Sequence, residues 1–283
     1  MNKKKIPKEC YKCEVNILFK TIKFKGIDET IKELLENKKS ISRFGDGEFK
    51  IIFGKNITFQ EYDKTLKNKL LKVLNSKLPN LLIGINKLYK SKNKIINKFH
   101  EKYKFQIAKI INKNKIYYDS GITRFNTRIK NKKIIKKYIT KFKKIWDNRN
   151  ILIIEGEKTR SGIGNNLFHN SKNIKRIICP AENSFKIYDK LIAFIKSIKL
   201  DKETLILTSL GPTATILSYD IYELGNQVID LGHFDLQYEF FLRNTKKIIK
   251  IPYKYVAEVE GGQYNISPIT DSEYFDQIIR KIY

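Results

Sequence analysis

Four short apolar runs in the second half of the chain constrain its fold more than any other feature. They cover residues 151–154, 176–179, 205–208 and 227–230, and stretches with helical spacing near 184–197 and 213–224 separate the later ones. Short apolar strands that alternate with helices are typical of a parallel sheet covered on both faces. The sequence therefore predicts an α/β fold, Rossmann-like, with a mostly parallel sheet and helices on both faces.

The first half of the chain continues the same alternation. Helical spacing covers residues 28–38, 60–76, 92–112 and 131–145, and strands are predicted at 81–85, at 116–118 and just before Phe44. No repeat or Pro/Gly/Ser-rich linker divides the chain, so we interpret 1–14 as a basic N-terminal tail and 15–283 as one domain. No apolar run is long enough for a transmembrane helix, and no apolar segment follows the basic start as in a secretory signal. We therefore expect a cytoplasmic protein.

The net charge of +28 is concentrated in one part of the chain. Residues 86–150 carry 21 basic and 3 acidic side chains, which gives that segment a net charge of +18. This segment is either a solvated lysine face or a patch attracted to an anionic surface, such as the inner face of a membrane. A nucleic-acid partner is not expected, because the aromatic residues there have core spacing and are not interleaved on the basic face.

Polar motifs follow several of the predicted strands directly. They lie at residues 45–48, 155–166, 209–215 and 231–239. Ligands of open parallel sheets bind at the carboxyl ends of the strands, so these four loops are expected to lie together.

The first of these loops contains the sequence SRFGDGEF, residues 42–49. An extended backbone would turn Asp46 and Glu48 to the same side, and hard cations such as Mg²⁺ or Mn²⁺ prefer such oxygen ligands. Gly45 and Gly47 flank the aspartate and leave room for a bound donor, and Arg43 could share the charge of a phosphate. Five other acid-x-acid pairs occur in the chain, so an ordinary surface turn remains the alternative.

The loops after the later strands offer groups suited to a phosphate or diphosphate. Gly211 and Thr213 begin a predicted helix, whose first backbone N–H groups attract anions, although a simple helix start would look the same. In the loop after residue 154, Gly162 and Gly164 allow a close backbone approach, Asn165 follows them, and Arg160 could bind two phosphate oxygens.

A further anion-binding candidate is Arg124, which follows the predicted strand 116–118. His233 follows the strand at 227–230 and is a candidate metal ligand, or else a histidine at a helix cap. Asp235 and Glu239 lie four residues apart on one predicted helix face, and either could act as the base for an acceptor hydroxyl.

Six ordered blocks resemble the GT-D-type bacterial glycosyltransferases, over about residues 25 to 245. These blocks are SRFGDGEF, YDSGITRFN, ILIIEGEKTRSGIGNNLF, IKRIICPAENSF, LILTSLGPTATILSYDI and DLGHFDLQYEFFL. The resemblance implies a Rossmann-like fold and a D-x-E motif, formed by Asp46 and Glu48, that needs a divalent metal. It also places His233 and Glu239 in the matching C-terminal block. One departure is Asn166, where the pattern suggests an aspartate.

The resemblance further implies a metal-dependent transfer of a hexose, with glucose expected, from a UDP-sugar to a glycan in surface glycoprotein or polysaccharide biosynthesis. The glycine-rich loops would then hold the nucleotide diphosphate. A metal-dependent phosphohydrolase of nucleotide or sugar phosphates is the main alternative, because the same ligands would serve with water as the acceptor.

Overall fold

The computed structural model describes residues 8–89 and 94–283 and contains one nine-stranded sheet. All neighbouring strands are parallel, in the order β1-β4-β3-β2-β8-β7-β5-β6-β9. The strands are β1 (Lys23–Lys25), β2 (Ser40–Phe44), β3 (Leu81–Ile85), β4 (Ile116–Asp119), β5 (Asn150–Gly156), β6 (Asn173–Cys179), β7 (Leu205–Ser209), β8 (Val228–Asp230) and β9 (Ile278–Lys281).

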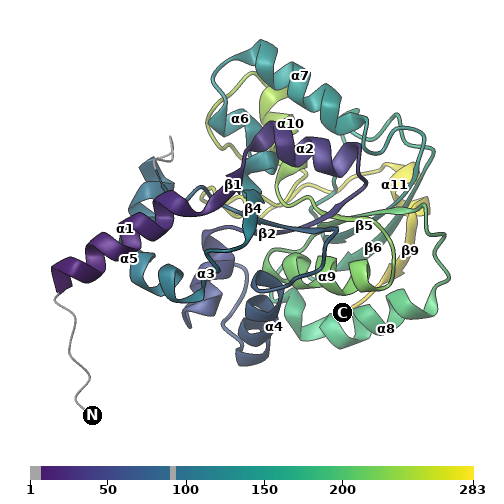
Figure 1. The fold of residues 1–283 in the computed structure, drawn as a ribbon. Helices are drawn as coiled ribbons and strands as arrows, with labels where there is room; N and C mark the ends of the chain where they lie inside the picture. Colours follow the sequence, from purple (N-terminus) through teal and green to yellow (C-terminus); the bar gives the residue numbers. More distant parts are fainter. Residues whose placement is uncertain (1–7, 90–93) are drawn as a thin grey trace.

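Helices cover both faces of this sheet, as Figure 1 shows. One face packs against α1 (Lys8–Thr21), α3 (Asp46–Ile52), α4 (Lys64–Leu74), α5 (Lys94–Ile110), α8 (Tyr188–Ser197) and α9 (Pro212–Glu223). The other packs against α2 (Ile27–Leu35), α6 (Phe125–Arg128), α7 (Lys132–Lys143) and α10 (Phe234–Leu242). Short turns of helix, η1 (Ser120–Thr123), η2 (Ser184–Ile187) and α11 (Ser272–Asp276), complete the elements. The predicted α/β fold is confirmed.

The interior strand β5 illustrates why the apolar runs were informative. Leu152 and Ile154 pack into the core on one face, and Ile151 and Ile153 pack into the core on the other. Because both faces are buried, the strand needs apolar residues at consecutive positions rather than at alternate ones. A strand of this kind lies in the middle of a two-sided sheet.

The prediction of a tail over residues 1–14 is partly wrong. Residues 8–14 belong to helix α1, whose Val15 and Phe19 are buried in the core, while residues 1–7 lie outside the described residues. Strands β1 and β9 were not predicted. Both are short edge strands with few buried side chains, so neither carries the apolar run that marks a central strand.

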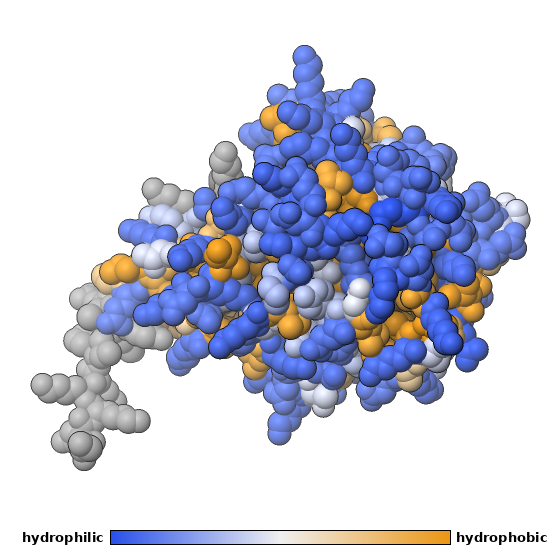
Figure 2. Space-filling view, turned by 45° about the vertical axis from the view of Figure 1, so that its right-hand side comes forward, coloured by the Kyte–Doolittle hydropathy of each residue, from blue (hydrophilic) through white to orange (hydrophobic). Residues whose placement is uncertain are grey.

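The lysine-rich segment does not form a single basic patch. Helix α5 lies on one face of the sheet and α7 on the opposite face. The side shown in Figure 2 is hydrophilic over most of its area. Contact with an anionic membrane therefore stays a prediction, and it would have to use one of the two helices. None of the helices within residues 8–89 and 94–283 is long and apolar enough to cross a bilayer.

Histidine 100 is buried on α5, and neither of its ring nitrogens has a hydrogen-bond partner within the described residues. Burial lowers the pKa of His100 to about 4. The unfolded chain, with a histidine pKa near ~6.5, therefore binds more protons between these two values than the folded chain does. The free energy of unfolding should fall as the pH decreases through this window, by roughly 3 kcal/mol from this side chain.

Chemical denaturation of the wild type and of His100→Phe between pH 7 and pH 4 measures this effect. The variant should lose less stability on acidification, while His169→Gln, which alters an exposed histidine, should follow the wild type. Identical pH profiles for His100→Phe and the wild type would contradict the assignment.

Candidate active site

The strand order places the carboxyl ends of β2 and β8 side by side, 184 or more residues apart along the chain. From β2 the chain enters α3 on one face of the sheet, and from β8 it enters α10 on the opposite face. Neighbouring parallel strands whose helices diverge in this way leave a crevice between their ends, where ligands of α/β proteins bind. The hydrogen-bonded ladder between β2 and β8 is short: its register consists of the pair Ile41 and Ile229.

Arg43 and Asp230 connect the two strands at the base of this crevice. The Arg43 guanidinium donates to the Asp230 carbonyl oxygen at 2.6 Å and to its carboxylate at 3.0 Å. It also donates to the Thr123 hydroxyl at 2.6 Å and to the Ser120 carbonyl at 3.0 Å. Burial raises the pKa of Asp230, and the charge of Arg43 offsets part of that shift. Most donors of Arg43 are thus used within the protein, so it organises the crevice rather than reaching freely into it.

Asp46 and Glu48 lie in the first turn of α3, and the extended backbone predicted for them is wrong. Gly45 is the N-cap, and its N–H donates to the Glu48 carboxylate at 2.7 Å. This is the glutamate half of a capping box, which favours a helix start at this position. Gly47 lies inside the helix, where a Cβ would meet Ile57 at an ordinary 3.4 Å, so the backbone does not require glycine there.

The acidic side chains of this corner suit a divalent cation by their chemistry, but residues i and i+2 of a helix do not face each other, so the same-side placement expected for Asp46 and Glu48 is not found. The Asp46 side chain is 62% exposed and pairs with Lys50 at 2.9 Å. Burial raises the pKa of Glu48 to about 7, and repulsion by the Asp230 carboxylate adds to the shift, so negative charge is crowded here. No group of three or more His, Cys, Asp or Glu side chains suited to a metal occurs within the described ranges. Two carboxylates with water and substrate oxygens are the coordination expected for Mg²⁺ or Mn²⁺.

His233, the N-cap of α10, contacts Arg124. Its Nδ1 lies 3.1 Å from Arg124 Nη2, and Arg124 Nη1 donates to Glu258 at 2.6 Å. Arginine has no acceptor, so Nδ1 must accept, and the proton of the neutral ring lies on Nε2. Burial lowers the pKa of His233 to about 4, with help from the Arg124 charge, so the ring is neutral near pH 7. This geometry favours an Nε2–H donor rather than the predicted metal ligand.

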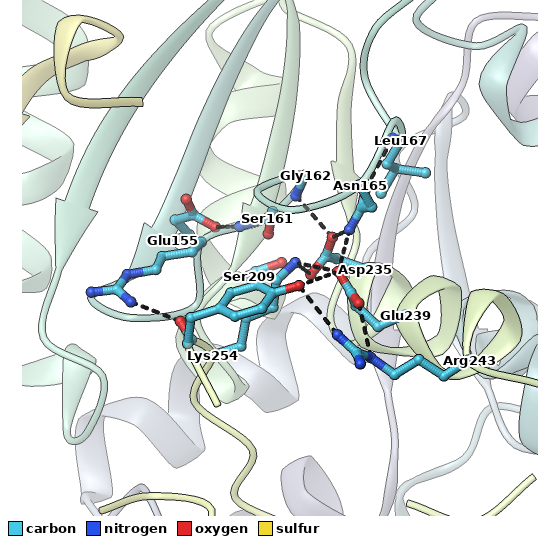
Figure 3. Close-up of polar contacts among 12 residues, drawn as sticks. Glu155, Ser161, Gly162, Asn165, Leu167, Ser209, Asp235, Glu239, Arg243 and Lys254 are labelled. Carbon is cyan, nitrogen blue, oxygen red and sulfur yellow. Dashed lines mark hydrogen bonds and ion pairs between the residues drawn. The ribbon is translucent and has the colours of Figure 1, made fainter. Parts of the chain in front are cut away.

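Asp235 and Glu239 belong to a buried charge cluster that Figure 3 shows. Lys254, with 0% of its side chain exposed, lies 2.5 Å from Asp235 and 3.3 Å from Glu239. The Asn165 amide donates to Asp235 at 2.9 Å and to Glu239 at 2.7 Å, and the Gly162 N–H donates to Asp235 at 2.8 Å. The cluster therefore fixes the loop after β5 against α10.

These contacts do not support the predicted role of Asp235 or Glu239 as a base. Both carboxyl groups are at least 96% shielded from solvent, and Arg243 approaches the remaining Glu239 oxygen at 3.4 Å. A general base must be within reach of the acceptor hydroxyl, and these oxygens are occupied by protein donors. The structure gives both residues a positioning role instead.

The loop after β5 uses its two glycines for internal packing. Gly162 and Gly164 have φ angles of +83° and +75°. A Cβ at Gly162 would lie 2.6 Å from Phe168, and one at Gly164 would lie 2.4 Å from Tyr253. Arg160 donates to the carbonyl oxygens of Tyr253 and Ser267 at 2.8 and 2.7 Å. The structure therefore accounts for these residues without a ligand, and their contact with a diphosphate stays a prediction.

The start of α9 lies beside the crevice, because α9 packs on both β2 and β8. Gly211, its N-cap, has φ +56°, and a Cβ there would lie 2.4 Å from Phe59. The Thr213 hydroxyl is buried and has no hydrogen-bond partner within the described part of the chain. Thr215, two residues further along, donates to the Arg43 carbonyl oxygen at 2.9 Å and so connects α9 to β2.

Comparisons with known proteins give the family of this chain. Its sequence matches the family described as "Glycosyltransferase GT-D fold" over residues 41–259. The chain belongs to the GT-D glycosyltransferase family. The GT-D chain is 33% identical over 268 residues to Glycosyltransferase GlyD of Streptococcus pneumoniae serotype 4. It is 34% identical over 266 residues to the probable glycosyl transferase Gly of Streptococcus gordonii.

These matches cover 92% and 91% of the GT-D chain but only 33% and 38% of the two relatives, so the chain spans about a third of their length. Among solved structures, one described as a new glycosyltransferase from Streptococcus sanguinis superposes with a TM-score of 0.86 at 29% identity, covering 93% of this chain and all of that one. Another, described as domain of unknown function 1792 with a distinct glycosyltransferase fold, gives 0.86 at 30% identity and covers 95% and 98%. The family and its fold, predicted from the six blocks, are confirmed.

Three residues that sequence reasoning missed are Asp230, Lys254 and Glu258. Asp230 is the last residue of an apolar run, a position where a polar residue could have been noticed. Lys254 and Glu258 belong to the segment 243–271, which forms no regular helix or strand and has no periodicity that marks a site. Only the folded GT-D chain brings them to α10 and to Arg124.

Proposed function

We propose that this GT-D chain transfers a hexose from a UDP-sugar to a glycan acceptor, with a divalent cation bound by Asp46 and Glu48. The observation that carries the proposal is the position of these two carboxylates in the first turn of α3, at the crevice between β2 and β8. Glucose is the expected sugar, and surface glycoprotein or polysaccharide biosynthesis is the expected context.

When bound, Mn²⁺ or Mg²⁺ would offset the negative charge of the donor diphosphate and of the departing UDP. The chain's own residues would hold the donor in place. Asp46 supplies an exposed carboxylate, while Glu48 is held by its hydrogen bond to Gly45 N–H and so presents a fixed orientation. The helix start also contributes backbone N–H groups, although the two acids there limit its attraction for an anion.

Arg124 and His233 are the donor-side groups that the geometry supports best. Arg124 is 27% exposed and already binds a carboxylate, Glu258, so its guanidinium is oriented for an anionic oxygen. The neutral His233 ring can donate from Nε2 to a phosphate or sugar oxygen without carrying a charge. Burial acts to raise the pKa of Glu258, but its neighbours His233 and Arg124 together bring the pKa below the usual value, so this carboxylate is ionised and competes with a diphosphate for Arg124.

Thermal unfolding in the presence of UDP with and without Mn²⁺ tests the proposal. A ligand that binds the native chain at about 100 times its Kd stabilises it by roughly 2.7 kcal/mol, which raises the Tm of a domain of this size by on the order of 5 °C. UDP and Mn²⁺ together should give this shift, and each alone should give much less. UMP, which lacks the diphosphate, is the control ligand.

The absence of stabilisation by UDP with Mn²⁺ at millimolar concentration would contradict the proposal. The same preparation also separates the phosphohydrolase alternative. Release of phosphate from UDP or from a sugar phosphate, at a rate that no glycan acceptor increases, would favour that reaction instead.

A further inference from the structure

One hollow in the described part of the chain lies over strand β6, with β5 and β7 between it and strand β8 of the crevice. It has a volume of about 480 Å³ and opens between the loop 162–169 and the segment 271–277, over strand β6. One wall is formed by the loop after β5 and the other by the short helix α11 with its flanking residues. We refer to it as the lateral cleft.

The charges in the floor of the lateral cleft are neutralised within the protein. Arg176 and Glu155 form an ion pair of 2.7 Å, with 1% and 0% of their side chains exposed. Arg176 also donates to the Gln277 side chain at 2.7 Å, and its guanidinium lies 5.0 Å from the centre of the Tyr274 ring. The floor therefore offers planar polar and aromatic surface without a free positive charge.

The walls of the lateral cleft carry acids, amides and a histidine. Asp271 and Glu273 lie on one wall, and Asn165, Asn166 and His169 lie on the other. These two carboxylates, with the arginine of the lining already paired to Glu155, make the opening unfavourable for a nucleotide diphosphate. Amide and carboxylate groups next to an aromatic ring instead suit a neutral ligand with many hydroxyl groups, which needs both donors and acceptors.

The lateral cleft is connected to helix α10 at the proposed donor site through the loop after β5, because Gly162 and Asn165 line the cleft and both donate to Asp235. Asn165 lines the cleft, and its amide donates to Asp235, which follows His233 by two residues (Figure 3). A saccharide in the cleft would thus lie on the other side of the loop that α10 holds in place. This adjacency distinguishes the lateral cleft from an unrelated surface hollow.

We propose that the lateral cleft binds a neutral saccharide and serves as the acceptor subsite of the transferase. This inference rests on the proposed function, because it names the place and the chemical class of the acceptor. Charge separates the two substrates: the anionic donor binds at the crevice, through Arg124 and the proposed cation, and the neutral acceptor binds at the acidic cleft.

Saturation-transfer NMR on the full chain, with lactose, cellobiose and N,N′-diacetylchitobiose as probes, tests the inference. At least one of these disaccharides should bind the wild type at millimolar concentration. Glu273→Ala and His169→Ala, one on each wall, should each weaken that binding about fivefold, the value of one lost hydrogen bond near 1 kcal/mol. Asp276→Ala is the matched control, because Asp276 is exposed on the same short helix as Glu273 but does not line the cleft.

The affinity for UDP with Mn²⁺, measured on the same variants, should equal that of the wild type. If none of the three disaccharides binds, or if Glu273→Ala and His169→Ala bind them as Asp276→Ala does, the inference is wrong. If disaccharides bind in this pattern but UDP does not bind at all, the cleft assignment holds as a saccharide site and the proposed transferase function fails.

Discussion

Replacing Asp46 by asparagine should reduce metal-dependent sugar transfer by at least about 10²-fold, the scale expected when a group that stabilises charge in the transition state is removed. Asparagine keeps the shape of the side chain but weakens its binding of a hard cation. The fold should survive, because Asp46 is 62% exposed and its ion pair, among the residues that the structure describes, is with Lys50 on the surface. Such exposed pairs contribute about 0–1 kcal/mol.

The measurement is the rate of UDP release from a UDP-hexose as a function of Mn²⁺ concentration. The matched control is Glu203→Gln, which alters another acid-x-acid pair at the amino-terminal edge of the sheet, just before β7. That control should transfer sugar like the wild type. An Asp46→Asn variant with an unchanged rate and an unchanged Mn²⁺ midpoint would show that Asp46 does not bind the cation.

Replacing Lys254 by methionine should cause a large loss of stability, about 3–5 kcal/mol. Lys254 is fully buried between Asp235 and Glu239, and methionine is similar in size but uncharged. Its removal leaves two buried carboxylates without their nearest positive charge. Urea denaturation measures the loss.

Arg243→Met is the control for this second substitution. Arg243 also contacts Glu239, at 3.4 Å, but its side chain is 41% exposed, so its loss should cost less than about 1 kcal/mol. Adding Asp235→Asn to Lys254→Met should restore part of the stability, because it removes one of the two buried negative charges that Lys254 no longer neutralises. Equal stabilities of Lys254→Met and Arg243→Met would refute the cluster's role.

The sheet was predicted well from the sequence, because a strand that is buried on both faces has a continuous run of apolar residues. Every residue of 151–154 must be apolar for β5 to lie between two layers of helices, and that run can be read without knowing its neighbours. Edge strand β9 could not be recognised in this way, since three of its four residues are exposed and do not need to be apolar. The helix at Asp46 was missed for a different reason. Two glycines around the aspartate suggested an extended turn, whereas the Glu48 cap and the packing of Phe49 and Ile51 favour a helix.

The candidate site could be predicted in its location but not in its contacts. The loops after β2, β7 and β8 do meet, as parallel strands require. Whether an acid is a catalyst or part of a buried ion pair depends on partners that are distant in sequence. Asp235 and Glu239 have the spacing of a catalytic pair, and only Lys254, with no pattern around it, shows that their charges are used internally.

The short ladder between β2 and β8 has a mechanical consequence. Strands β1 to β4 form one half of the sheet and β5 to β9 the other, and the backbone joins these halves through Ile41 and Ile229 alone within the described sheet. The ion pair of Arg43 and Asp230, helix α9 and the hydrophobic clusters shared by both halves lie across the seam. A seam of this kind can flex as a hinge more readily than a full ladder. A donor that contacts Asp46 on one half and His233 on the other would clamp the two halves together.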